Sequence, residues 1–191
     1  MLKRILLLLL ISTSSFADSS DSDNFNGVSR FGLAFGGEEL LIRNDGQELT
    51  AAGFFYLSGG TNYSIPDTNF QIEASLGYNF DSMESSSGKH RFKELSAELI
   101  TFYNITEKTK IGLGIFQVLS AELSGSILPS KFGNSTGTVI EINWKVGNKA
   151  AWGLRHVNVD LPFDRVNGIN VSASNVEIDG SYTALISYHY F

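Results

Sequence analysis

Apolar and polar residues alternate along most of this chain, and the clearest example runs from Phe70 to Asp81. One phase of that segment is apolar throughout and consists of Phe70, Ile72, Ala74, Leu76, Tyr78 and Phe80. Successive side chains of a β-strand point to opposite faces of the sheet. The pattern therefore predicts a single strand with one apolar and one polar side.

The same alternation recurs in seven other places, which gives eight predicted strands: Arg30–Gly36, Tyr56–Ile65, Phe70–Asp81, Glu94–Tyr103, Lys110–Phe116, Thr138–Gly147, Trp152–Val159 and Tyr182–Tyr190. About 10 tilted residues cover the roughly 25 Å apolar band of a transmembrane barrel, and single-chain bacterial barrels have an even number of strands. We therefore expect an all-β fold, an eight-stranded antiparallel up-and-down transmembrane β-barrel.

The connections between these strands alternate strictly between short and long. The short ones are rich in turn formers and cover residues 66–69, 104–109 and 147–150, while the long polar ones cover 37–48, 82–91, 119–137 and 161–180. Transmembrane barrels of bacteria have short periplasmic turns and long extracellular loops. This asymmetry predicts that both chain termini lie in the periplasm.

The N-terminus has the features of an export signal. Lys3 and Arg4 precede the apolar run Ile5–Ile11, and Ser15-Phe16-Ala17 suits signal peptidase. We therefore expect residues 1–17 to be a cleaved signal peptide, residues 18–28 an acidic flexible tail, and residues 29–191 the barrel, in the outer membrane of a Gram-negative bacterium. The alternative of a membrane-anchoring helix is disfavoured because such a helix needs about 20 apolar residues.

Composition narrows the possible functions. The chain has 14 Lys and Arg against 20 Asp and Glu, and loss of the leader leaves 12 against 20. An acidic protein of this kind is a poor candidate for nucleic-acid binding. The chain has no cysteine, which excludes disulfides, thiolate metal sites, a cysteine nucleophile and lipoprotein acylation.

Alternation alone does not say which face is turned to lipid, because a soluble lipocalin-type barrel has the same periodicity with the faces reversed. Aromatic residues gather in the apolar phase near the predicted periplasmic strand ends: Tyr63, Phe70, Tyr103, Trp144, Trp152, Tyr188 and Tyr190. Tyr and Trp favour membrane interfaces because each has an apolar body and a polar tip. We therefore expect these residues to face lipid headgroups.

The opposite phase carries the charged residues Arg30, Glu73, Asp81, Glu94, Glu98, Lys110, Glu141, Lys145 and Arg155, together with His189. At this density they cannot face hydrocarbon, so we expect them to line the lumen. Four positive charges against five negative ones are close to balance, whereas a selective pore more often has a surplus of one sign. Because eight strands enclose a space that side chains fill, we expect a plugged lumen rather than an open channel.

Three segments resemble known proteins: residues 30–36 (RFGLAFG), residues 153–156 (GLRH) and the end of the chain, residues 186–191 (ISYHYF). Because of these three segments, residues 29–191 resemble the small outer-membrane β-barrel superfamily that includes the membrane domain of the OmpA type. Tyr188, Tyr190 and Phe191 are similar to the C-terminal signal by which the outer-membrane assembly machinery recognises its clients. Phe191 is one residue out of the usual phase, which leaves the end of the last lipid-facing row open.

A basic cluster in the second long connection contains Lys89, Arg91 and Lys93 beside His90. At the outer surface these cations could pair with the phosphates of lipopolysaccharide, although an ordinary solvated loop is the alternative. With the surrounding outer-membrane lipid, lipopolysaccharide is the partner that the sequence predicts, and no partner outside the cell is identified.

The sequence gives little indication of an enzymatic activity. Some small barrels modify lipid A. The lipid A deacylase type uses a His and a Ser near the outer rim of a late strand, and His156 is the candidate here. However, the segment His156-Val157-Asn158 lacks a serine two residues on. We expect no cofactor and no metal, and we expect a structural or surface-interaction barrel. A lipid-active enzyme and a narrow solute channel are the alternatives.

Overall fold

A computed structural model describes residues 24–42, 46, 48–85, 88–126, 128–172 and 176–191. The predicted signal peptide, and residues 18–23 of the predicted tail, lie outside this part of the chain. The tail is shorter than expected, because the first strand begins at Phe25 and residues 25–28 belong to the sheet. No helix in the described ranges is both long and apolar enough to cross a membrane.

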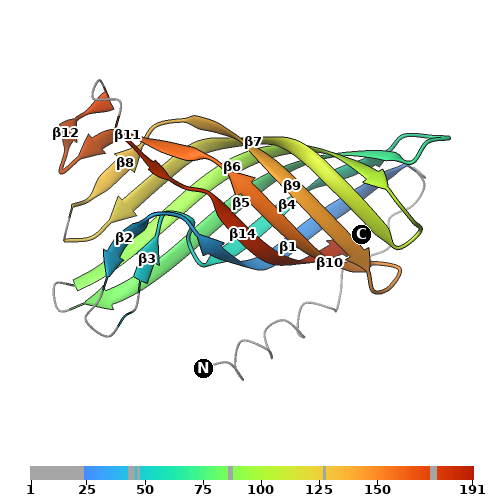
Figure 1. The fold of residues 1–191 in the computed structure, drawn as a ribbon, viewed down its shortest axis with the longest axis horizontal. Helices are drawn as coiled ribbons and strands as arrows, with labels where there is room; N and C mark the ends of the chain where they lie inside the picture. The colour runs from blue at the N-terminus through green and yellow to red at the C-terminus, as the bar shows by residue number, and fades with distance from the viewer. Residues whose placement is uncertain (1–23, 43–45, 47, 86–87, 127, 173–175) are drawn as a thin grey trace.

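Eight long strands form a closed antiparallel ring (Figure 1). They are β1 (Phe25–Gly36), β4 (Phe55–Ser64), β5 (Phe70–Ser85), β6 (Gly88–Asn104), β7 (Thr109–Ser124), β9 (Ser135–Lys145), β10 (Ala150–Asn158) and β14 (Tyr182–Tyr190). Each pairs with the next, and β1 pairs with β14 to close the ring. Every predicted segment falls on one of these strands, so the predicted fold class is confirmed.

The two ends of the barrel differ. Three tight turns connect β4 to β5, β6 to β7 and β9 to β10 at one end, which we call the turn end. The last residue lies there too, since Gly27 and Phe191 exchange backbone hydrogen bonds of 2.7 and 3.0 Å. The opposite end, which we call the loop end, carries the remaining connections (Figure 1).

The loop-end connections contain more strand than predicted. Six short strands lie in the described parts of these connections: β2 (Glu39–Ile42), β3 (Glu48–Thr50), β8 (Ser130–Phe132), β11 (Asp160–Val166), β12 (Ile169–Asn170) and β13 (Glu177–Asp179). Residues 82–91, predicted as a long loop, mostly continue β5 and β6, which stay paired as far as Ser85 and Gly88. In these parts of β5 and β6 the outward positions are polar. The alternation of apolar and polar residues therefore ends, although the backbone pairing continues.

Two kinds of side chain, polar and apolar, fill the barrel. Most of the charged side chains lie in the middle of the barrel and toward the turn end, where Ile100, Phe102 and Ile186 are also buried. Toward the loop end the filling is mainly apolar and comes from the ring and the loop-end strands. The apolar cluster includes Leu49, Ala51, Ala52, Met83, Phe92, Val118, Ala121, Leu123, Phe132, Val159, Leu161 and Ile178. The loop-end segments thus cover the lumen with a small core of their own.

Inward glycines allow bulky neighbours to fit in this narrow interior. A Cβ atom at Gly60 would collide with the Ala74 carbonyl oxygen and with the Ser75 side chain, whereas one at the adjacent, outward Gly59 would meet open space. Only a residue without a side chain can therefore occupy position 60 without moving β5.

We expect Gly60→Val to destabilise the barrel by about 2 kcal/mol or more, because an overpacked interior forces side chains and backbone to shift. The matched control is Gly59→Val, which should stay within about 0.5 kcal/mol of the parent because it adds a side chain to open space. Urea unfolding in detergent, followed by tryptophan fluorescence, measures both. Equal stability of the two variants would contradict this packing.

Candidate functional site

An ion-pair network crosses the lumen. The Arg30 guanidinium pairs with Glu73 and, at 3.1 Å, with Glu98 Oε2. Glu98 Oε1 in turn lies 3.1 Å from Arg155 Nη2, and Arg155 Nη1 lies 3.8 Å from Glu141 Oε2. All five side chains have no exposed surface. Glu98 is therefore the central anion, held between two arginines from different strands.

Two tyrosines complete the network. The Tyr56 hydroxyl donates to Glu98 Oε1 at 3.0 Å and accepts from both arginines, and the Tyr188 hydroxyl donates to Glu141. Each arginine also lies over an aromatic ring, Arg155 at 4.5 Å from the Tyr56 centroid and Arg30 at 4.8 Å from that of Tyr188. The members come from seven of the eight ring strands, so the network ties almost the whole circumference together.

Two further charged residues are buried on either side of this centre. Lys110 Nζ lies 3.9 Å from the centre of the Phe102 ring and donates to Gln71 Oε1 at 3.2 Å. On the loop-end side, Glu94 accepts a 3.0 Å hydrogen bond from Asn79 Nδ2. Seven of the nine charged residues predicted to line the lumen are therefore buried there.

Lys145 and Asp81 are the two exceptions, and the side chain of Lys145 is exposed. The prediction that it joins the lumen is wrong because β9 ends at this residue, where the side chain reaches solvent at the rim. Asp81 is only half-buried and accepts a hydrogen bond from the Ser82 backbone at 2.7 Å.

The last strand has the opposite phase to the predicted one. Tyr188 is fully buried in the lumen and Tyr190 is mostly buried beside it, with their rings stacked at 5.7 Å, so the prediction that both face lipid is wrong. His189, predicted for the lumen, alternates outward instead. The outward phase of β14 contains Leu185 but also the polar residues Thr183, Ser187 and His189, so its polarity resembles that of a lumen face. Phe191 falls in this outward phase and its ring lies over Gly27, which removes the apparent offset.

The other five predicted interface aromatics point outward near the turn end. Phe70 and Tyr103 are about half exposed, with ring centroids 5.1 Å apart, and Trp144 and Trp152 are direct cross-strand neighbours. Tyr63 packs against Phe25 at 4.6 Å. These residues form an arc of aromatic side chains on the outer surface.

Between this arc and the loop end, the outer surface is apolar. The exposed large side chains include Leu57, Ile72, Leu76, Leu95, Leu99, Ile111, Leu113, Ile115, Ile140, Leu154 and Leu185. Monomeric soluble proteins rarely expose a contiguous apolar patch of this extent. The faces are those of a barrel in lipid, apolar outside and charged inside.

Lys89, Arg91 and Lys93 lie in the outward phase of β6 and alternate with the buried residues His90 and Phe92. Lys93 pairs loosely with Glu122 on β7 at 3.9 Å. Two cations that sequence reasoning missed lie in register beyond Glu122, namely Lys131 on β8 and Arg165 on β11. Each comes from a different connection, so no local sequence signal joins them to the β6 cluster.

His156 faces outward, and β10 pairs regularly with both neighbours there. Its Nδ1 lies 3.1 Å from Thr183 Oγ1. In the connection that follows β10, the Ser172 hydroxyl is hydrogen-bonded to Asn170 at 2.7 Å, and Ser174 lies outside the described residues. Within the described ranges, no group of three or more His, Asp or Glu side chains could hold a metal.

Comparisons with known proteins give structural matches alone. No family model matches the chain, and no curated protein sequence matches it. Among solved structures, the attachment invasion locus protein Ail of Yersinia pestis is 11% identical, with a TM-score of 0.50 over 89% of this chain and all of that one.

Two further structures are similar. Ail in complex with the heparin analogue sucrose octasulfate is 12% identical, with a TM-score of 0.49 over 89% of this chain and 100% of that chain. Neisserial surface protein A is 14% identical, with a TM-score of 0.47 over 87% and 96% of the two chains. The resemblance to the OmpA type holds at the level of architecture. The chain has the closed eight-stranded fold of the small outer-membrane β-barrel proteins.

Proposed function

We propose that this protein resides in the outer membrane, where a plugged polar lumen holds the barrel rigid and the loop end acts at the cell surface in a structural or interaction role. The observation that carries the proposal is that charged residues lie inside the barrel and apolar residues cover its outer surface. The buried residues include Arg30, Glu98 and Arg155, while leucine and isoleucine side chains cover the outside. A soluble lipocalin-type barrel needs the reverse arrangement.

The orientation of the termini is supported by the division of the connections. The tight turns and the C-terminal residue share one end, and the loop-end strands form an elaborated surface at the other (Figure 1). Short turns of bacterial barrels face the periplasm. In this proposal both termini are periplasmic, after removal of residues 1–17. Tyr188, Tyr190 and Phe191 act as the C-terminal assembly signal.

A plugged lumen is supported by what fills it. The ion-pair network extends across the interior between opposite strands, and the apolar cluster around Phe92 and Leu161 covers it toward the loop end. An ion crossing the barrel would have to separate paired charges and then enter an apolar layer. Both steps cost free energy, so the interior serves as a core.

The proposed partners are outer-membrane lipid and lipopolysaccharide. The apolar outer belt suits acyl chains, and the outward cations Lys89, Arg91 and Lys93 begin one alternation step beyond Leu95, where the belt ends on β6. Phosphate groups of lipopolysaccharide lie at that height of an outer membrane, and lysine and arginine form charge-assisted contacts with phosphate.

Localisation tests the proposal directly. We expect the mature protein in the outer-membrane fraction of a Gram-negative host, with an electrophoretic mobility that changes on boiling because the closed barrel resists detergent until heated. A periplasmic lipocalin-type protein expressed in parallel serves as the control. Recovery of the chain in the soluble periplasmic fraction, with no heat-dependent shift, would overturn the proposed membrane location.

Arg155→Ala tests the lumen. We expect it to destabilise the barrel by about 3 kcal/mol or more, because it leaves Glu98 and Glu141 buried with fewer cationic partners. Lys145→Ala is the matched control, and it should be nearly neutral since Lys145 is exposed. Urea unfolding in detergent measures the difference, and planar bilayers should show no steady current from either protein. Large, stable single-channel currents from the parent would contradict the plugged lumen.

A further inference from the structure

One row of side chains runs across five neighbouring strands on the outer face. Cross-strand pairing places Phe80 opposite Lys93, Lys93 opposite Glu122, Glu122 opposite Lys131, and Lys131 opposite Arg165. On the other side, Phe80 is opposite Phe55, and these two rings stack at 5.2 Å. The row is therefore aromatic at one end and charged at the other.

The row also climbs along the barrel. Phe80 lies ten residues from the turn-end residue of β5, Lys93 lies eleven residues from that of β6, and Glu122 lies thirteen from that of β7. Lys131 and Arg165 belong to the loop-end strands β8 and β11, beyond the ring. The aromatic end thus sits level with the top of the apolar belt, and the cationic end lies above it.

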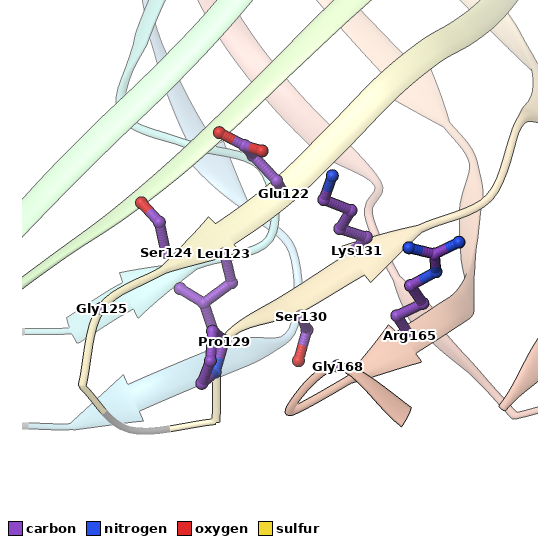
Figure 2. A pocket seen from close by; sticks show the side chains of 9 residues that line it. All are labelled: Glu122, Leu123, Ser124, Gly125, Pro129, Ser130, Lys131, Arg165 and Gly168. Carbon is purple, nitrogen blue, oxygen red and sulfur yellow. The ribbon is translucent and has the colours of Figure 1, made fainter. Parts of the chain in front are cut away.

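The charged end has an excess of cations. Figure 2 shows Glu122, Lys131 and Arg165 projecting from the same side of β7, β8 and β11. Arg91, one alternation step beyond Lys93, lies between the uncharged residues Ser82 and Ser124. Glu122, which pairs with Lys93 and is opposite Lys131, and Asp164, 3.7 Å from Arg165, offset part of the positive charge. Lys89 contributes less, because Glu84 is directly opposite.

Hollows lie along both halves of the row. A surface pocket of about 190 Å³ is lined by Tyr78, Phe80, Asp81, Ser82, Arg91, Phe92 and Lys93. A second pocket, of about 260 Å³, is lined on the charged side by Glu122, Lys131 and Arg165 (Figure 2). The first joins the stacked rings of Tyr78 and Phe80 to two cations and one half-buried carboxylate, Asp81. An anionic amphiphile requires an apolar surface for its chains and an excess of cations for its headgroup.

We propose that this row is a binding site for a phosphorylated, acylated glycolipid of the outer leaflet, with acyl chains against Phe55, Tyr78 and Phe80 and phosphates held by Arg91, Lys93, Lys131 and Arg165. The inference rests on the proposed membrane location and adds two cations from distant loops to the β6 cluster. Because paired strands already hold the backbone of these cationic residues in place, little backbone has to become ordered when the lipid binds.

The test uses fluorescently labelled lipopolysaccharide titrated into the mature protein in phosphatidylcholine nanodiscs. The site variant carries Arg91→Gln, Lys131→Gln and Arg165→Gln. The matched control carries Lys108→Gln, Lys145→Gln and Lys149→Gln, which remove the same charge from exposed positions at the turn end. We expect the apparent Kd to rise about tenfold or more for the site variant, and less than about twofold for the control.

Three additional arms identify the ligand. Dephosphorylated lipopolysaccharide should bind the parent as weakly as intact lipopolysaccharide binds the site variant. Inorganic phosphate and dextran sulfate should compete poorly, because neither offers acyl chains to the aromatic end. Phe80→Ser should weaken binding of intact lipopolysaccharide while leaving any residual dextran sulfate binding unchanged.

Equal losses of lipopolysaccharide affinity in the site variant and the control would overturn the proposed site, since they would mean that net charge alone determines the affinity. Competition by dextran sulfate as strong as that by unlabelled lipopolysaccharide would also overturn it, in favour of a soluble polyanion. Fractionation and the heat-dependent shift are measured on every variant. Their failure in the parent counts against the proposed location, whereas normal fractionation with unchanged lipopolysaccharide affinity counts against the site alone.

Discussion

Pairing of the first and last ring strands is the constraint on which the rest of this structure depends. Strand β1 is matched to β14 from Val28–Tyr190 to Gly36–Tyr182, so no strand of the ring keeps an unpaired edge. In hydrocarbon, backbone groups have no water to bond, and a sheet satisfies all of them only when it is closed. Closure with eight strands fixes a narrow interior, and alternation then assigns every second residue to it.

The interior explains the unusual burial of charge. Removing arginines and carboxylates from water costs several kcal/mol for each ion, and the attraction between them offsets this only when geometry and hydrogen bonding are good. Glu98 meets that condition, with two arginines and the Tyr56 hydroxyl around its oxygens. Such a network is weak support for high stability, but it is specific: a shift of register by one residue would turn Arg30 or Arg155 toward lipid.

The sequence predicted the ring strands well because two environments act on them at once. A residue such as Leu76 faces the apolar outer surface while Gly77 faces the lumen, and the period of two follows directly. In β14 the signal is reversed. Thr183 and Ser187 face outward, while Ala184, Ile186 and Tyr188 pack inside against glycines and arginines. Polarity alone therefore assigned the wrong face, although the strand itself was correctly placed.

Loop-end structure was harder to predict for a different reason. Beyond the apolar belt the outward residues no longer need to be apolar, so strands such as β6 continue through Arg91 without the alternation that marks them lower down. Contacts between loops depend on register over long separations, as for Lys131 and Arg165. Sequence reasoning could locate the β6 cations, because alternate spacing is local, but it could not add their partners from β8 and β11.

The tilt of the strands relates cross-strand pairing to height along the barrel axis. A row perpendicular to tilted strands must climb relative to the barrel axis, so residues in register are at different heights. Along the row from Phe55 to Arg165, side-chain chemistry changes from aromatic to cationic in the direction of the climb. A bilayer imposes the same gradient, from acyl chain to phosphate, over a similar rise. A single cross-strand row can therefore follow one lipid molecule from chain to headgroup, which neither a local loop nor a single strand could do.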